Sequence, residues 1–139
     1  MKLRWLDRRI ACPGPYLALC LTEAEFHAAL RHCKVTARPP MLHSPAADAT
    51  THYLTNPKGQ LVCAVCLGPH EDRNAIEVAG LLVHEAVHVW QEHSKNIGEA
   101  TPAIEQEAYA IQSIAQELLA EYARRLAPCA KRASSSLPS

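Results

Sequence analysis

The chain lacks a surplus of charge of either sign, since 14 Lys and Arg balance 14 Asp and Glu among its 139 residues. Proteins that bind nucleic acids usually carry excess positive charge, so we expect no nucleic-acid partner. The sequence also lacks an apolar run long enough to cross a membrane. Its first ten residues are charged throughout and lack the apolar centre of a secretory signal. We therefore expect a cytoplasmic protein with no membrane partner.

Cysteine pairs at metal-ligand spacing are scarce, although the chain has 6 cysteines. Cys63 and Cys66 form a C-x-x-C pair, which could belong to a zinc knuckle or a redox motif. The pair lies in an apolar run that reads as a strand, where residues three apart face opposite sides of a sheet. No second C-x-x-C pair follows it. We therefore predict buried, inert thiols in a reducing compartment.

Length and composition indicate one domain with a modest core, which we expect over residues 1–126. Residues 127–139 are small and polar, which predicts a disordered tail. The first half of the domain reads as mixed strand and helix. Two local signals divide it into elements: a capping box at Thr22 and Glu25, and a turn at residues 56–59. The expected elements are a strand over residues 16–21, a helix from Thr22 to about His32, and a hairpin with strands over 51–55 and 60–67.

The most informative pattern is His84-Glu85-Ala86-Val87-His88, which reads H-E-x-x-H. Two histidines four residues apart project from one face of a helix, so their ring nitrogens can share one tetrahedral zinc ion. Glu85 flanks the pair, where it can act as a general base on a water molecule. Residues 72–91 carry an apolar stripe at helical spacing, which supplies the helix that the motif needs. The alternative is a pair of solvated surface histidines.

A catalytic zinc site needs a third protein ligand, and the next segment offers carboxylates. Thr101 and Pro102 are a helix-start signal, and the helix that follows reads over residues 103–122. Glu105 and Glu107 lie in its first two turns, close to the connection from the motif helix. By periodicity Glu107 lies nearer the apolar face than Glu105 does. A carboxylate there would complete a His-His-Glu set.

The H-E-x-x-H motif, a short connection and then E-x-x-A-Y together resemble the gluzincin branch of zinc peptidases, and the small minigluzincin type in particular. The resemblance implies one Zn²⁺ per chain, held by His84, His88 and Glu105, with Glu85 as the catalytic base. Glu107 stays the alternative third ligand. Tyr109 stands where the family has an aspartate that orients a ligand histidine. Histidine ligands normally need such a partner for the other ring nitrogen.

The resemblance implies an α+β, zincin-like domain, in which a short sheet with a hairpin packs on the H-E-x-x-H helix and a second helix follows. The sequence is also similar to small peptidases that phages and prophages encode. It therefore predicts a zinc-dependent metallopeptidase acting on a peptide or protein substrate, with a phage or host protein as a further partner. The alternative is a non-catalytic, zinc-stabilised structural or binding component of a phage particle, which would place the protein in the virion. Five residues are candidates for stabilising the oxyanion: His52, Tyr53, His70, His93 and Tyr109.

Overall fold

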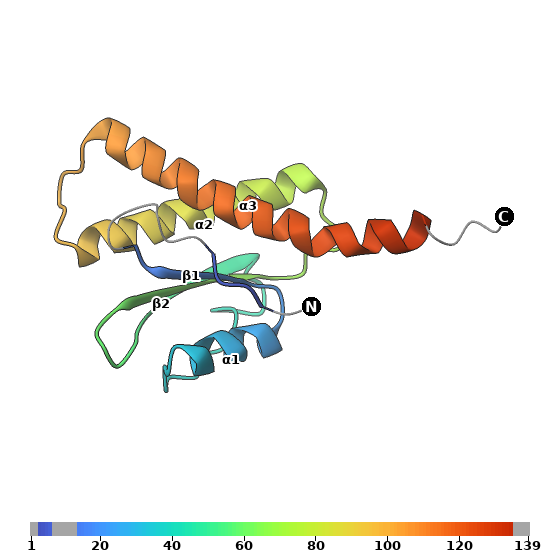
Figure 1. Cartoon of the computed structure of the whole chain (residues 1–139), viewed down its shortest axis with the longest axis horizontal. Helices are drawn as coiled ribbons and strands as arrows, with labels where there is room; N and C mark the ends of the chain where they lie inside the picture. The colour runs from blue at the N-terminus through green and yellow to red at the C-terminus, as the bar shows by residue number, and fades with distance from the viewer. Residues whose placement is uncertain (1–2, 7–13, 135–139) are drawn as a thin grey trace.

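The computed structural model describes residues 3–6 and 14–134, and the side chains of the last helix as far as Leu126. In that part of the chain, three helices and a three-stranded mixed sheet form an α+β fold, which confirms the expected class (Figure 1). The strands are β1 (Tyr16–Cys20), β2 (Ala49–Thr55) and β3 (Leu61–Leu67), in the order β1-β3-β2. The central strand, β3, is thus the last of the three in sequence. It runs parallel to β1 and antiparallel to β2.

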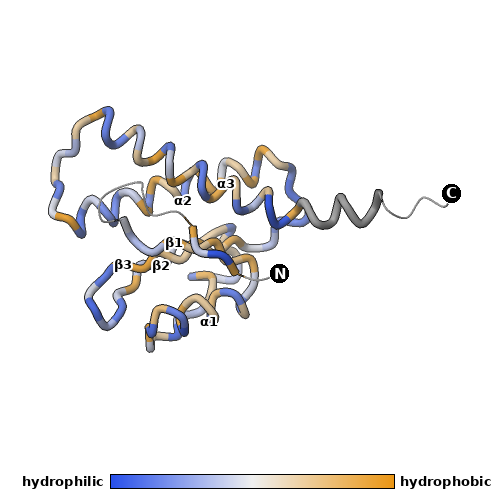
Figure 2. The backbone as a smooth tube through the Cα atoms, in the orientation of Figure 1, coloured by the Kyte–Doolittle hydropathy of each residue, from blue (hydrophilic) through white to orange (hydrophobic). Residues whose placement is uncertain are grey.

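The hairpin of β2 and β3 forms where the turn residues predict it. The Asn56 side chain accepts hydrogen bonds from the backbone N–H groups of Lys58 and Gln60, at 3.0 and 2.9 Å. Gly59 has φ +78, a left-handed conformation that glycine adopts without strain. The turn is hydrophilic, whereas β3, the strand that follows it, is hydrophobic (Figure 2). Local turn chemistry therefore fixes the register that brings β2 alongside β3.

Both faces of the sheet are covered, which explains why β3 is apolar at every position. All of β3 is buried, as is typical of a strand with layers on both sides. Helix α1 (Glu23–His32) covers one face through Phe26 and Leu30. Helices α2 (Ala75–Asn96) and α3 (Ile104–Ser134) cover the other face, with a core that includes Trp90 and Leu118. Figure 1 shows α2 and α3, which cross one another, on the side of the sheet away from α1.

The C-x-x-C pair is divided between the two layers. Cys63 packs in the core under α2 and α3, whereas Cys66 packs in the core under α1. Both thiols are free and buried, which confirms the predicted burial. Burial raises the pKa of the Cys63 thiol to about 12, so the reactive thiolate form is scarce near neutral pH.

Helix α3 is longer than the sequence predicts, because it continues to Ser134 through residues that we expected to be a disordered tail. Residues 130–133 are Ala, Lys, Arg and Ala, which are good helix formers and allow the helix to extend. Residues 135–139 lie outside the described part of the chain. Within residues 3–6 and 14–134, no helix has both the length and the apolar character that crossing a membrane requires.

A buried ion-pair network joins α3 to α1 and β1. The Arg125 guanidinium is 4% exposed and donates to the Glu121 carboxylate at 2.8 Å, to Glu25 on α1 and to the Leu19 carbonyl at 3.3 Å. Burial by itself would raise the pKa of the Glu121 carboxyl, but hydrogen bonds from Arg124 and Arg125 outweigh it and lower that pKa. Removing any one member of the network would therefore leave a buried charge without its partner.

Replacing Arg125 with Met should lower the free energy of unfolding by about 3–5 kcal/mol, because Glu121 is left buried with an incomplete set of partners. Urea unfolding followed by circular dichroism measures the change. Arg31→Met, at an exposed position of α1, is the matched control and should change stability by less than about 0.5 kcal/mol. Equal stability of the two variants would show that the network contributes nothing to the fold.

Candidate metal centre

The capping box of Asn74 and Glu77 starts α2 and sets the phase of the helix. The Asn74 side chain accepts from the Glu77 backbone N–H at 2.9 Å, and the Glu77 side chain accepts from the Asn74 backbone N–H at 3.1 Å. From this start, one side of α2 packs on α3 and another on the sheet. His84 and His88 lie on the strip between these two contacts, where α2 reaches solvent. The H-E-x-x-H motif is therefore helical, as expected.

The two motif histidines meet through the same ring nitrogen. The Nε2 atoms of His84 and His88 are 3.1 Å apart, and the rings are 4.7 Å apart at 76°. Two ligands at about 2.0–2.1 Å from a tetrahedral zinc ion are roughly 3.3 Å from one another, by the geometry of the tetrahedron. Two neutral imidazoles can meet in this way if one donates to the other, or if both direct lone pairs at one cation. The spacing therefore fits a shared zinc ion.

His88 has a partner for its second ring nitrogen. The Gln91 Oε1 atom lies 3.1 Å from Nδ1 of His88, one helical turn further along α2. Histidine ligands of zinc usually donate from the distant ring nitrogen to an oxygen acceptor, and Gln91 offers one. This role of Gln91 was not predicted from the sequence, although a spacing of three residues on a helix is a signal for such a contact.

Glu85 points away from the histidine strip and toward the sheet. Its side chain accepts a hydrogen bond from the Thr51 hydroxyl of β2, and the residue is 6% exposed. The described residues provide no other hydrogen bond to this carboxylate. Thr51 and Glu85 are 34 positions apart in the chain, so no local pattern in the sequence could reveal the pair. The proposed base is thus anchored at one oxygen atom.

On the other side of α2, the structure brings in Glu107 and not Glu105. The Trp90 indole Nε1 donates to Glu107 Oε2 at 2.9 Å. Glu105 is exposed at the start of α3, and no described contact joins it to α2. Among the residues that the structure describes, no group of three His, Cys, Asp or Glu side chains is close enough to hold a metal ion. The histidine pair therefore supplies two donors, and either glutamate as third ligand stays a prediction.

A cleft of about 410 Å³ lies between the C-terminal part of α2 and the start of α3. Gln91, Trp90 and Glu107 all line it, together with Lys95 and Glu99. Gln91 also contacts His88, so one residue joins the cleft to the histidine pair. The cleft is therefore lined by one carboxylate of α3 and by one neighbour of His88.

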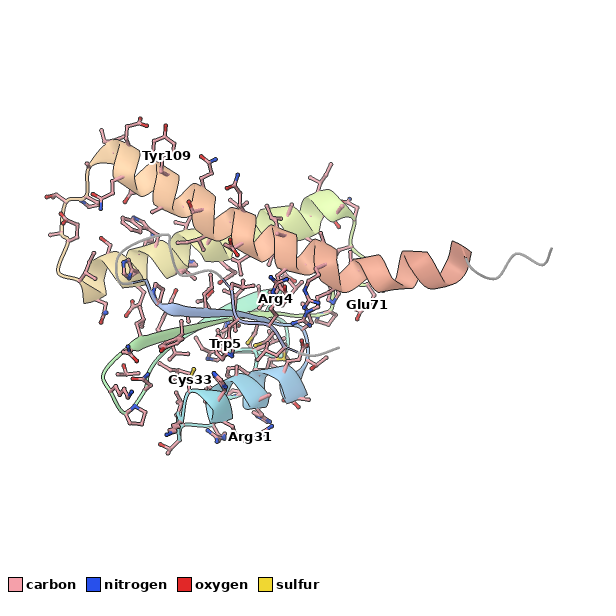
Figure 3. The ribbon with its side chains drawn as sticks, in the orientation of Figure 1. Arg4, Trp5, Arg31, Cys33, Glu71 and Tyr109 are labelled. Atoms are coloured by element: carbon pink, nitrogen blue, oxygen red, sulfur yellow. The ribbon has the colours of Figure 1, made fainter. Side chains whose placement is uncertain are left out.

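Four of the five candidate oxyanion residues are engaged elsewhere or lie on another surface. His52 stacks on Phe26 under α1, with ring centres 4.6 Å apart. Nδ1 of His70 lies 2.7 Å from the Tyr122 hydroxyl. His93 is 2% exposed, and burial lowers its pKa. Figure 3 shows Tyr109 on the outer side of α3, where it is 65% exposed.

Tyr53 is the fifth candidate, and it lies on the same side of β2 as Thr51, which contacts Glu85. Its side chain is partly open to solvent, at 37%. Burial of the remainder and then the neighbouring acidic groups Cys63, Glu85 and Glu92 raise the pKa of Tyr53. The phenol therefore stays protonated near neutral pH and can donate a hydrogen bond.

Comparison of the chain with family models, with curated proteins and with solved structures finds no match. The chemistry of the centre has to be inferred from its own residues.

Replacing Thr51 with Val keeps the shape of the side chain and removes the donor to Glu85. We expect the free energy of unfolding to fall by about 1.5–3 kcal/mol, the range for a hydrogen bond to a charged group. Thr55→Val, at an exposed position of the same strand, is the control and should stay near the wild type. Chemical denaturation of both variants at neutral pH is the measurement, and a loss confined to Thr55→Val would contradict the role given to Thr51.

Proposed function

We propose that this protein is a zinc-dependent metallopeptidase that hydrolyses peptide bonds, with one zinc ion per chain. The observation that carries the proposal is the 3.1 Å approach of the His84 and His88 Nε2 atoms, with Glu85 on the adjacent side of the same helix. A metal site that served only to stabilise the fold would need no carboxylate beside it.

The zinc ligands in this proposal are His84, His88 and a glutamate from the start of α3. The resemblance to gluzincins implies Glu105. The hydrogen bond from Trp90 to Glu107 supports Glu107 instead, because it turns this carboxylate toward α2 and the cleft that Gln91 also lines. A glutamate would balance part of the charge of the cation, since both imidazoles bind in the neutral form.

Zinc, when bound, supplies a Lewis acid that polarises the scissile carbonyl and lowers the pKa of a water molecule toward neutrality. Glu85 accepts a proton from the attacking water and returns it to the amine nitrogen as the C–N bond breaks. Thr51 holds one oxygen of this carboxylate and so limits the directions from which the other can take a proton. Tyr53 donates its phenolic proton in a hydrogen bond to the carbonyl oxygen as negative charge develops there.

A peptide or protein substrate is supported by the position of β2. β2 lies at the edge of the sheet and pairs only with β3 among the described strands, so one side of its backbone has no strand partner among them. An extended peptide can bind such an edge as an additional strand. Because β2 also carries Thr51 and Tyr53, a peptide bound there would pass next to Glu85.

One observation favours the alternative of a zinc-stabilised domain without activity. The hydrogen bond from Thr51 gives Glu85 a partner in the fold, so this carboxylate has a structural role even without catalysis. The activity of a Glu85 variant separates the two functions.

Purified protein should bind about one zinc per chain, and the double variant with His84→Ala and His88→Ala should lose it, since two of the three protein ligands are removed. Elemental analysis after dialysis measures the metal content. His43→Ala removes an exposed histidine that contacts Thr50 and should keep the zinc. Full retention in the double variant would refute the site.

The same assay distinguishes the two glutamates. We expect Glu107→Gln to weaken zinc binding more than Glu105→Gln, because only Glu107 is held against α2 in the structure. The reverse order would favour the ligand implied by the resemblance to gluzincins.

Glu85→Gln should keep its zinc, but its rate of peptide hydrolysis should fall by about two orders of magnitude or more, because the amide cannot accept the proton of water. Cleavage of a mixed peptide library, with and without a chelator, measures the activity. Glu23→Gln, at an exposed position of α1, is the control and should keep most of the activity. If the zinc-loaded wild type cuts no peptide at neutral pH, the alternative without activity is favoured.

A further inference from the structure

Gln91 is the residue outside the H-E-x-x-H motif that the described structure brings into hydrogen-bonding distance of a motif histidine. Its Oε1 atom is 3.1 Å from Nδ1 of His88. Gln91 is exposed, and it lines the cleft at the start of α3. It therefore contributes little to the core, and its contact with His88 calls for another explanation.

The chemistry of this contact determines where His88 carries its proton. An amide oxygen only accepts hydrogen bonds, so Nδ1 of His88 must be the donor. A neutral imidazole has one N–H group, and Nε2 is then left with a free lone pair. Nε2 is the atom that lies 3.1 Å from the matching nitrogen of His84. The contact with Gln91 thus leaves Nε2 of His88, the nitrogen that faces the proposed metal position, free to bind a cation.

Tyr109 is 65% exposed and does not fill this role. It stands in the sequence where the resemblance leads one to expect an orienting aspartate, but it projects from the outer side of α3 (Figure 3). Gln91 provides an acceptor from the motif helix itself.

We propose that Gln91 is a positioning residue that holds His88 in the tautomer with Nδ1 protonated, so that His88 binds zinc through Nε2. The inference rests on the proposed function, because it assigns a role toward zinc. The tautomer itself can be measured without the metal.

Three variants test the proposal. Gln91→Met keeps the length of the side chain and its helix propensity but removes the acceptor. Gln91→Glu keeps an acceptor and adds a charge, which strengthens the hydrogen bond. Gln112→Met makes the same change as Gln91→Met at an exposed position of α3 and is the matched control.

Two measurements are made on each protein. Long-range ¹H–¹⁵N NMR of chelator-treated protein reports which ring nitrogen of His88 is protonated. Competition with a chromophoric chelator gives the zinc affinity. The wild type should show His88 protonated at Nδ1, and Gln91→Met should mix the two tautomers and bind zinc about 10–100-fold more weakly. Gln91→Glu should bind at least as tightly as the wild type, and Gln112→Met should be unchanged.

Unchanged zinc affinity in Gln91→Met would overturn the inference and leave the proposed function intact. Equal losses in Gln91→Met and Gln91→Glu would also overturn it, because the presence of an acceptor would then make no difference. If the wild type binds no zinc, the proposed function and this inference both fail.

Discussion

The packing of α2 against both α3 and the sheet determines where the side chains of the candidate centre lie. α3 covers one side of the helix through the core around Trp90, and the sheet covers another through residues such as Leu82 and Val89. The strip of α2 between these contacts reaches solvent, and His84 and His88 lie on it. A 3.6-residue period places Glu85 about a quarter turn from that strip, against β2. The packing of α2 therefore places the two histidines of the motif at the surface and its glutamate against the sheet.

The two neighbours also supply the partners of the motif. From the sheet side, Thr51 donates to Glu85, and Tyr53 lies further along the same strand. From the α3 side, the Trp90 indole fixes the carboxylate of Glu107. Glu85 and Tyr53 thus lie on the sheet side of α2, and Glu107 lies on the α3 side. In the proposed function, the residues on the sheet side transfer protons, and the carboxylate on the α3 side binds the metal.

The sequence predicts those parts of the structure that depend on neighbours in the chain. The capping residue Thr22, the turn at Asn56 and the motif helix follow from interactions over a few positions, and the structure confirms them. The parallel pairing of β1 with β3 joins residues more than forty positions apart, and no local pattern encodes it. The contact of Glu85 with Thr51 was missed for the same reason. The contact of His88 with Gln91 is local and could have been found from its spacing.

The central claim is that one zinc ion binds between the imidazoles of His84 and His88. X-ray absorption at the zinc edge, on protein loaded with one equivalent of zinc, tests it most directly. The account predicts two imidazole nitrogens at about 2.0–2.1 Å and at least one oxygen ligand. A zinc–sulfur distance of about 2.3 Å would place the metal on cysteine and contradict the account, as would a spectrum without imidazole scattering.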